Sequence, residues 1–151
     1  MTVNILSRRK FADVFNLVKD DKEAFFISIV EPDDYIEFSP KSDNYRTYSF
    51  YDLEDDIANG AGHIYKAISE EQAKDMFEFI KDNKDKKKCY VHCHAGISRS
   101  GAVGSFIHEY FGGAYKKLLE RFPHIFPNGR VTRMLRMYER LDYIGEGEIK
   151  F

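Results

Sequence analysis

The sequence has few of the features that mark membrane-spanning, secreted or nucleic-acid-binding proteins. No apolar run approaches the roughly 18 residues of a transmembrane helix. The N-terminal stretch MTVNILSRRK lacks the basic-then-apolar order of a secretion signal. Acidic and basic side chains nearly cancel to a net charge of −2, which disfavours a globally basic nucleic-acid-binding protein. We therefore expect a cytoplasmic protein whose partners include neither nucleic acid nor a membrane, and we expect it to be a monomer.

Cysteine is scarce, with two residues in a chain of 151, and tryptophan is absent. Two cysteines cannot build a disulfide framework and fit a reducing compartment. If the segment from Cys89 to Cys93 is extended, their Cα atoms lie roughly 13 Å apart, beyond the roughly 7 Å that a disulfide can bridge. Cys89 is therefore expected to be a core thiol. The histidines show no spacing that would assemble a metal site, so we expect neither a metal nor a cofactor.

The chain does have enough apolar residues, 43%, to bury the core of one domain, and we expect residues 1–151 to form it. Apolar, β-favouring runs at 3–6, 25–30, 45–51 and 89–92 alternate with segments of helical periodicity. Ser69 and Gln72 make a capping box that starts one of these helices. In the last helix we expect five apolar residues to face inward: Val131, Met134, Leu135, Tyr138 and Leu141. This order predicts an α/β fold, with a central, mainly parallel sheet of about four or five strands and helices on both faces.

The segment from Val91 to Gly101, VHCHAGISRSG, joins the last predicted strand to a helix that begins near Arg99. Such a loop gathers free backbone N–H groups and the positive end of the helix dipole, which suits a bound phosphate or an anionic sulfur. A free cysteine has a pKa of roughly 8.5, and these surroundings lower it so that the nucleophilic thiolate dominates at neutral pH. Arg99 can hold two oxygens of a phosphoryl group side by side, as lysine cannot. We therefore predict that the loop binds phosphate and that Cys93 attacks it.

Cys93 and Arg99, with five residues between them in HCHAGISRSG, resemble the signature loop of cysteine-dependent protein tyrosine phosphatases, most closely the small dual-specificity branch. The resemblance implies the fold of that family and a cysteine nucleophile. It also implies that Arg99 is the transition-state clamp and that Ser100 donates a hydrogen bond to the departing thiolate. His92 would help to hold the loop, and Asn128, in a Pro-Asn turn typical of the family, would buttress it. The residues that would cradle the phosphate are His94, Ala95, Gly96, Ile97, Ser98 and Arg99.

Cleavage of a phosphate ester also needs a proton donor for the leaving oxygen, which typically contributes about 10²- to 10⁴-fold. In similar phosphatases this donor is an aspartate that follows a strand upstream of the signature loop. Asp52 in FYDLEDD occupies such a place, and Asp55 and Asp56 stay as alternatives because they follow closely. The glycine-containing segment 53–68 is interpreted either as a mobile lid that carries the acid or as a plain surface insertion.

The resemblance therefore implies a metal-independent protein phosphatase that acts on a phosphorylated protein or peptide. Phosphotyrosine is the favoured substrate, and phosphoserine and phosphothreonine are further substrates if the pocket is shallow. Residues 94–98 contain no lysine, whereas phosphatases of inositol phosphates commonly carry lysines there. An RNA 5′-phosphatase of the same fold and a catalytically silent phosphotyrosine-binding module stay as alternatives. Tyr35 and Phe38 either flank an aromatic phosphoester or pin their loop to the core.

Overall fold

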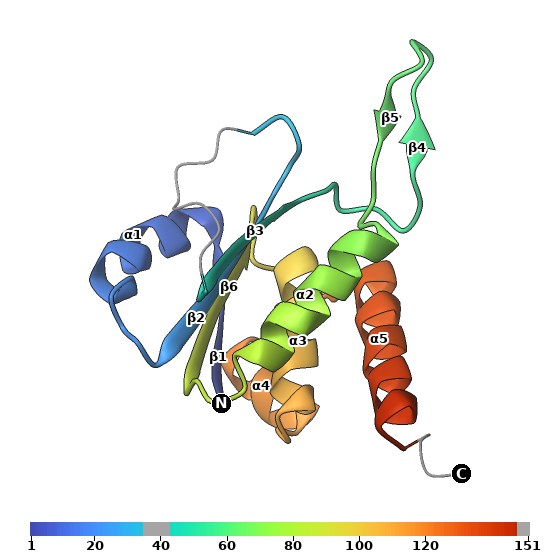
Figure 1. The fold of residues 1–151 in the computed structure, drawn as a ribbon. Helices are drawn as coiled ribbons and strands as arrows, with labels where there is room; N and C mark the ends of the chain where they lie inside the picture. The colour runs from blue at the N-terminus through green and yellow to red at the C-terminus, as the bar shows by residue number, and fades with distance from the viewer. Residues whose placement is uncertain (35–42, 148–151) are drawn as a thin grey trace.

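A four-stranded parallel sheet forms the centre of the computed structural model, which describes residues 1–34 and 43–147. Its strands are β1 (Thr2–Ser7), β2 (Ala24–Val30), β3 (Tyr45–Ser49) and β6 (Lys88–Cys93), in the order β1-β6-β2-β3 (Figure 1). All neighbouring pairs are parallel. Every residue of β2 is buried, as expected for an inner strand covered on both faces. The predicted parallel sheet is confirmed; Tyr35 and Phe38 lie outside the described residues.

Helices cover both faces of this sheet, as the sequence predicts. α1 (Arg8–Val18) lies on one face, and α2 (Glu70–Asp82), α3 (Arg99–Tyr110), α4 (Tyr115–Arg121) and α5 (Gly129–Gly147) lie on the other (Figure 1). Successive side chains of a strand point to opposite faces, so β2 contributes to two cores. Phe25 packs in the larger core with α2 and α3, whereas Phe26 packs against Phe11 and Phe15 of α1. Among the described residues, no helix combines the length and apolar character needed to cross a membrane.

Two sequence predictions concern the helices of the larger core, namely the start of α2 and the inward face of α5. Ser69 starts α2 with both hydrogen bonds of the predicted capping box. In α5, Val131 and Leu135 are buried as predicted, whereas Leu141 is 54% exposed and lines a cavity between α2 and α5. Leu141 therefore lies on the side of α5 that faces α2, but the cavity leaves its side chain uncovered.

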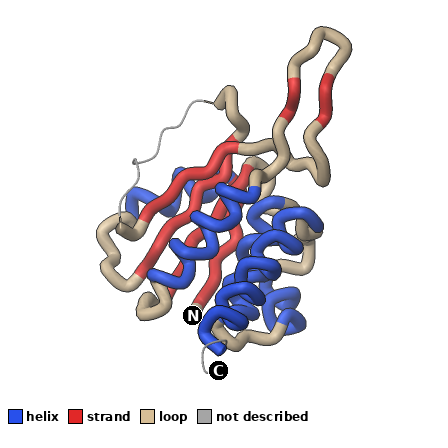
Figure 2. Tube along the Cα trace, turned by 45° about the vertical axis from the view of Figure 1, so that its right-hand side comes forward, coloured by secondary structure: helices blue, strands red, loops and turns tan. Residues whose placement is uncertain are grey.

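The segment 53–68, predicted to be a loop, contains a β-hairpin. β4 (Ile57–Ala58) pairs antiparallel with β5 (Ile64–Tyr65), and the hairpin projects from the rest of the structure (Figure 2). Strands of two residues are too short to show an alternating pattern in the sequence. The turn between them is closed locally, because the side chain of Asn59 accepts hydrogen bonds from the backbone amides of Ala61 and His63.

Candidate active site

The loop between β6 and α3 lies at the carboxyl end of the central sheet. β6 ends at Cys93 and α3 begins at Arg99, so residues 94–98 form the connection. Gly96 has a φ of +74°, and a Cβ there would lie 2.7 Å from the backbone nitrogen of Ser7. Ser7 stands beside Cys93 because β1 pairs in parallel with β6. Only glycine can therefore make this turn so close to the neighbouring strand.

Three carbonyl groups of the loop accept hydrogen bonds from neighbouring segments. The carbonyl of His94 accepts a hydrogen bond from the first amide of α1 at 3.1 Å. The carbonyls of Ile97 and Ser98 accept from the amides of Phe126 and Asn128, at 2.9 and 3.0 Å. This bracing leaves amides of the loop directed at Cys93, which is the arrangement of a backbone anion site.

Cys93 is surrounded by hydrogen-bond donors although it is 3% exposed. Its Sγ lies 3.1 Å from the Ser100 hydroxyl and accepts a hydrogen bond from the Gly96 amide at 3.3 Å. Burial by itself would raise the pKa of Cys93, but the Ser100 hydroxyl and loop amides outweigh it and lower the pKa below its ordinary value. The contrast is Cys89 on the same strand, where burial raises the pKa of the thiol. The two cysteines are both free thiols, and only Cys93 has surroundings that favour a thiolate.

Arg99 is 4% exposed, and its guanidinium is held from two sides. Nη1 donates to the Phe50 carbonyl at 2.8 Å, and Nη2 lies 3.5 Å from a carboxylate oxygen of Glu31. Nε is buried and has no hydrogen-bond partner among the described residues. A buried donor of this kind is uncommon in proteins and is suited to bind an anion.

Asp52 lies against the loop from the segment that follows β3. Its Oδ1 accepts hydrogen bonds from the Ser98 hydroxyl and from the side-chain amide of Asn128, both at 2.8 Å. Ser98 stands at the N-cap position of α3, yet its side chain makes no capping bond because it is turned to Asp52. The amides at the start of α3 therefore keep their capacity to bind an anion.

The other two candidate aspartates, Asp55 and Asp56, interact with residues outside the loop. Asp55 is 90% exposed at its side chain and lies 3.6 Å from Arg130 of α5. Asp56 accepts a hydrogen bond from the amide of Ala67 at 2.9 Å, which closes the base of the hairpin. That hydrogen bond is the main reason why the pKa of Asp56 lies below its ordinary value. Of the three candidates, Asp52 is the one that the described structure brings to the loop.

Asn128 connects three parts of the site. Its backbone amide donates to Ser98, and its side-chain amide donates to Asp52 and, at 3.3 Å, to the carbonyl of Leu53. Its Oδ1 accepts a hydrogen bond from the amide of Val131, which caps the N-terminus of α5. Asn128, predicted to support the loop, thus contacts both the loop at Ser98 and the segment of Asp52 and Leu53.

His92 lies fully buried under the loop, on the α1 side of the sheet. Its Nε2 is 2.8 Å from the Ser28 hydroxyl, and its Nδ1 is 3.2 Å from the Cys93 carbonyl. Burial lowers the pKa of His92 to about 4, so the imidazole is neutral at pH 7. Its position supports the loop from below, and it takes no proton at neutral pH.

Three groups at the site were missed from the sequence: the carboxylate of Glu31, the carbonyl of Phe50 and the hydroxyl of Ser28. Glu31 directly follows β2, and β2 is parallel to β6, so their carboxyl ends meet at one edge of the sheet. This parallel pairing could have pointed to Glu31. Phe50 contributes a backbone atom, and Ser28 lies within an otherwise apolar strand, so neither carried a signal in the sequence.

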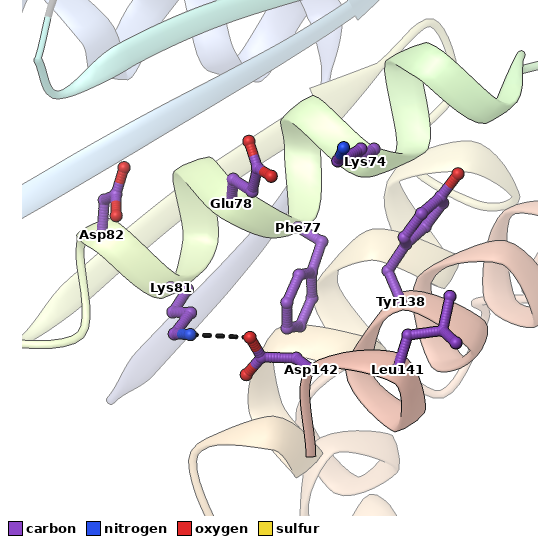
Figure 3. A pocket seen from close by; sticks show the side chains of 8 residues that line it. All are labelled: Lys74, Phe77, Glu78, Lys81, Asp82, Tyr138, Leu141 and Asp142. Atoms are coloured by element: carbon purple, nitrogen blue, oxygen red, sulfur yellow. Dashed lines mark hydrogen bonds and ion pairs between the residues drawn. The ribbon is translucent and has the colours of Figure 1, made fainter. Parts of the chain in front are cut away.

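A cavity of about 530 Å³ lies between α2 and α5, away from this loop (Figure 3). Figure 3 shows that the Lys81 ammonium and the Asp142 carboxylate are paired across it, at 2.7 Å. Its lining contains neither cysteine nor a residue of the loop. The described residues contain no group of three or more histidine, cysteine, aspartate or glutamate side chains that could hold a metal ion.

Comparison with known proteins agrees with the geometry, although no family model matches the chain. The chain is 39% identical over 71 residues to the tyrosine-protein phosphatase vhp-1 of Caenorhabditis elegans. The match covers 43% of this chain and 11% of that relative, so the chain corresponds to a small part of the relative's length.

Three solved structures are similar over most of the chain. PTPMT1, crystallised with PI(5)P, superposes with a TM-score of 0.55 at 15% identity, covering 96% of this chain and 94% of that one. DUSP15 gives a TM-score of 0.53 at 17% identity, with 90% and 81% covered. The human tyrosine phosphatase-like serine/threonine/tyrosine-interacting protein gives 0.51 at 22% identity, with 91% and 87% covered. The predicted resemblance is confirmed, and the chain has the fold of tyrosine and dual-specificity phosphatases.

Proposed function

We propose that residues 1–151 form the catalytic domain of a metal-independent protein phosphatase that hydrolyses phosphotyrosine, with phosphoserine and phosphothreonine as further substrates. The observation that carries the proposal is the convergence of three features on one loop. The thiol of Cys93 is bonded to Ser100 and a loop amide, the buried Nε of Arg99 has no partner among the described residues, and Asp52 is bonded to Ser98. A thiolate, a phosphate clamp and a carboxyl group are the groups that phosphoester hydrolysis through a cysteine requires.

In the first step of the proposed reaction, the Cys93 thiolate attacks phosphorus while the loop amides and Arg99 hold the phosphoryl oxygens. A bond forms between Sγ and phosphorus, and the bond from phosphorus to the ester oxygen breaks. Asp52 in its acid form gives its proton to that oxygen, so a neutral phenol or alcohol leaves.

In the second step, a water molecule attacks phosphorus, and the bond from phosphorus to Sγ breaks. Asp52 now acts as base and takes a proton from the water, which restores its acid form and releases inorganic phosphate. The Ser100 hydroxyl, 3.1 Å from Sγ, donates a hydrogen bond to the departing thiolate. Glu31 and the Phe50 carbonyl act as positioning groups that hold the guanidinium of Arg99 in its orientation.

Two neighbours in fold raise alternatives. PTPMT1 was crystallised with a phosphoinositide, but residues 94–98 of this chain contain no lysine that would pair with further phosphate groups. The human interacting protein is described as phosphatase-like, and a binding module that only holds phosphotyrosine is the second candidate. The presence of Cys93, Arg99 and Asp52 together favours catalysis over binding alone.

The test is hydrolysis of a small aryl phosphate by the purified protein in excess chelator, beside Cys93→Ser and Cys89→Ala. We expect turnover in chelator, a loss of at least about 10⁴-fold in kcat for Cys93→Ser, and activity in Cys89→Ala that stays close to the original. Acid quenching during turnover should trap phosphate on Cys93. Inactive protein that still binds phosphotyrosine peptides would favour the binding module, and activity that disappears with chelator would contradict the thiolate mechanism.

A further inference from the structure

The β4–β5 hairpin has a defined shape, because both its base and its tip are closed by hydrogen bonds. At the base, Asp56 accepts from the amide of Ala67 at 2.9 Å, and the Tyr51 amide donates to the Lys66 carbonyl at 2.8 Å. At the tip, the side chain of Asn59 accepts from two backbone amides. A segment held at both ends can present a defined surface to a ligand without first being ordered.

One face of this hairpin lines a pocket, and the opposite face points away from that pocket. The pocket has a volume of about 380 Å³, within the usual range for ligand sites. Its lining residues are Glu31, Tyr51, Asp52, Leu53, Ile57 and Tyr65. Ile57 stands opposite Tyr65 in the hairpin, so both point to the pocket face, whereas Ala58 and Ile64 form the opposite pair on the other face.

The pocket is continuous with the proposed reaction site through two of its walls. Asp52 is bonded to Ser98 of the loop, and Glu31 contacts Arg99. The lining includes no residue of the loop 94–98, so the pocket lies beside the phosphate position and not over it. A peptide that places its phosphorylated residue in the loop therefore has this pocket next to a neighbouring residue.

The side chains that line the pocket determine which type of neighbouring residue it would accept. Ile57 is 51% exposed, and with Leu53 and the rings of Tyr51 and Tyr65 it offers apolar surface. The two rings pack edge to face with centroids 5.1 Å apart, which fixes one wall. The carboxylate of Glu31, at the end of the pocket next to Arg99, repels an acidic side chain.

We propose that this pocket selects phosphorylated substrates by binding an apolar side chain adjacent to the phosphorylated residue, and that it disfavours acidic residues there. The proposal rests on the phosphatase function proposed above. It assigns the hairpin to substrate selection and leaves the chemical step to the loop.

The experiment compares phosphotyrosine peptides that differ at one position, with leucine, serine or glutamate at each of the three positions on either side of the phosphotyrosine. A small aryl phosphate, which cannot reach the pocket with a neighbouring residue, reports the chemical step separately. At one position or more we expect the leucine peptide to exceed the glutamate peptide in kcat/KM by about tenfold, since burying a leucine side chain corresponds to roughly that factor. Equal kcat/KM values at all positions would overturn the proposal.

Variants on the two faces of the hairpin supply the matched control. Ile57→Ser and Tyr65→Ser should each lower the ratio of leucine-peptide to aryl-phosphate activity by about fivefold or more. Ile64→Ser should leave that ratio unchanged, because Ile64 has a similar exposure, 48%, but faces away from the pocket. An equal loss in Ile64→Ser would contradict the assignment. Failure of all proteins, the unaltered chain included, on the aryl phosphate would instead contradict the phosphatase function itself.

Discussion

The loop of residues 94–98 and the β4–β5 hairpin are both short connections, but they are stabilised in different ways. The loop is attached to the central sheet, and its polar groups are bonded to segments far away in sequence, including Asp52 and Asn128. The hairpin is closed by local bonds and projects with half-exposed apolar side chains, Ile57 and Ile64. A rigid polar loop suits chemistry, for which groups must be held within a fraction of an ångström, whereas an exposed apolar arm suits selection among substrates.

The largest effect that separates these regions is expected from Asp52. Asp52→Asn keeps an oxygen that can accept from Ser98 but removes the acidic proton. We expect kcat to fall by about 10²- to 10⁴-fold for a phosphate ester with a poor leaving group. For an aryl phosphate whose leaving group needs no proton, the loss should be smaller. The measurement is kcat against the pKa of the leaving group, for the unaltered and altered proteins.

The matched control is Asp55→Asn, which lies three residues on, towards the hairpin, and pairs with Arg130. Its kcat should stay within about twofold of the original, since an exposed ion pair contributes little. If Asp55→Asn or Asp56→Asn caused the large loss and Asp52→Asn did not, the proton donor would have been misassigned.

The burial of His92 under the loop should also appear in the dependence of stability on pH. His92, under the loop, has a folded-state pKa of about 4 against an ordinary value of 6.5, because burial disfavours the imidazolium. The unfolded chain therefore binds the proton more readily than the folded one. The stabilising contribution is fully present above pH 6.5 and is lost as the pH falls from 6.5 towards 4. The difference between the two pKa values corresponds to about 3 kcal/mol.

Denaturant unfolding between pH 7 and pH 4 measures this loss. His92→Gln keeps a polar side chain but cannot titrate, so the part of the pH dependence due to His92 should disappear even if the variant is less stable throughout. An unaltered slope in His92→Gln would contradict the neutral, buried state of this histidine.

The sequence predicted the loop better than the hairpin because the information for the loop is contiguous. Cys93, Gly96 and Arg99 lie within one short segment, and the turn that it makes requires a glycine. The parallel sheet was predictable for a similar reason, since β2 is apolar apart from Ser28 and β6 contains the short apolar run from Cys89 to Val91. The long-range contacts of Arg99 with Glu31 and Phe50 could not be predicted, because they depend on which strand ends lie side by side.

The hairpin escaped prediction for a different physical reason. Its strands contain two residues each, and the hydrogen bond that closes its base joins Asp56 to Ala67 across the whole segment. The same aspartate was a candidate for the proton donor, and only its partner shows that it is structural. Helical periodicity correctly placed Leu141 on the side of α5 that faces α2, but it does not show that a cavity leaves this side chain half exposed.

The smallest predicted effect is a change in the free energy of unfolding when one glycine from each region is replaced by alanine. Gly96 in the loop and Gly62 in the hairpin both have positive φ, +74° and +83°, so alanine is strained at either position. They differ in space, because a Cβ on Gly96 would meet the backbone of Leu6 and Ser7 at under 3 Å, whereas a Cβ on Gly62 would meet nothing within 4 Å. We expect Gly62→Ala to lower the free energy of unfolding by about 1 kcal/mol, which is the cost of the backbone conformation alone. Gly96→Ala should cost about 2 kcal/mol or more, because the loop must also move away from β1.

The two substitutions should also separate activity from stability. If the loop moves, its amides no longer converge on Cys93, so Gly96→Ala should weaken inhibition by inorganic phosphate and lower kcat on an aryl phosphate. Gly62→Ala should change neither, since the hairpin takes no part in the chemical step. Denaturant unfolding, phosphate inhibition and aryl phosphate turnover, measured on both variants, test the division. Equal losses of activity in the two variants would show that loop and hairpin are coupled, and the separation of chemistry from selection would then fail.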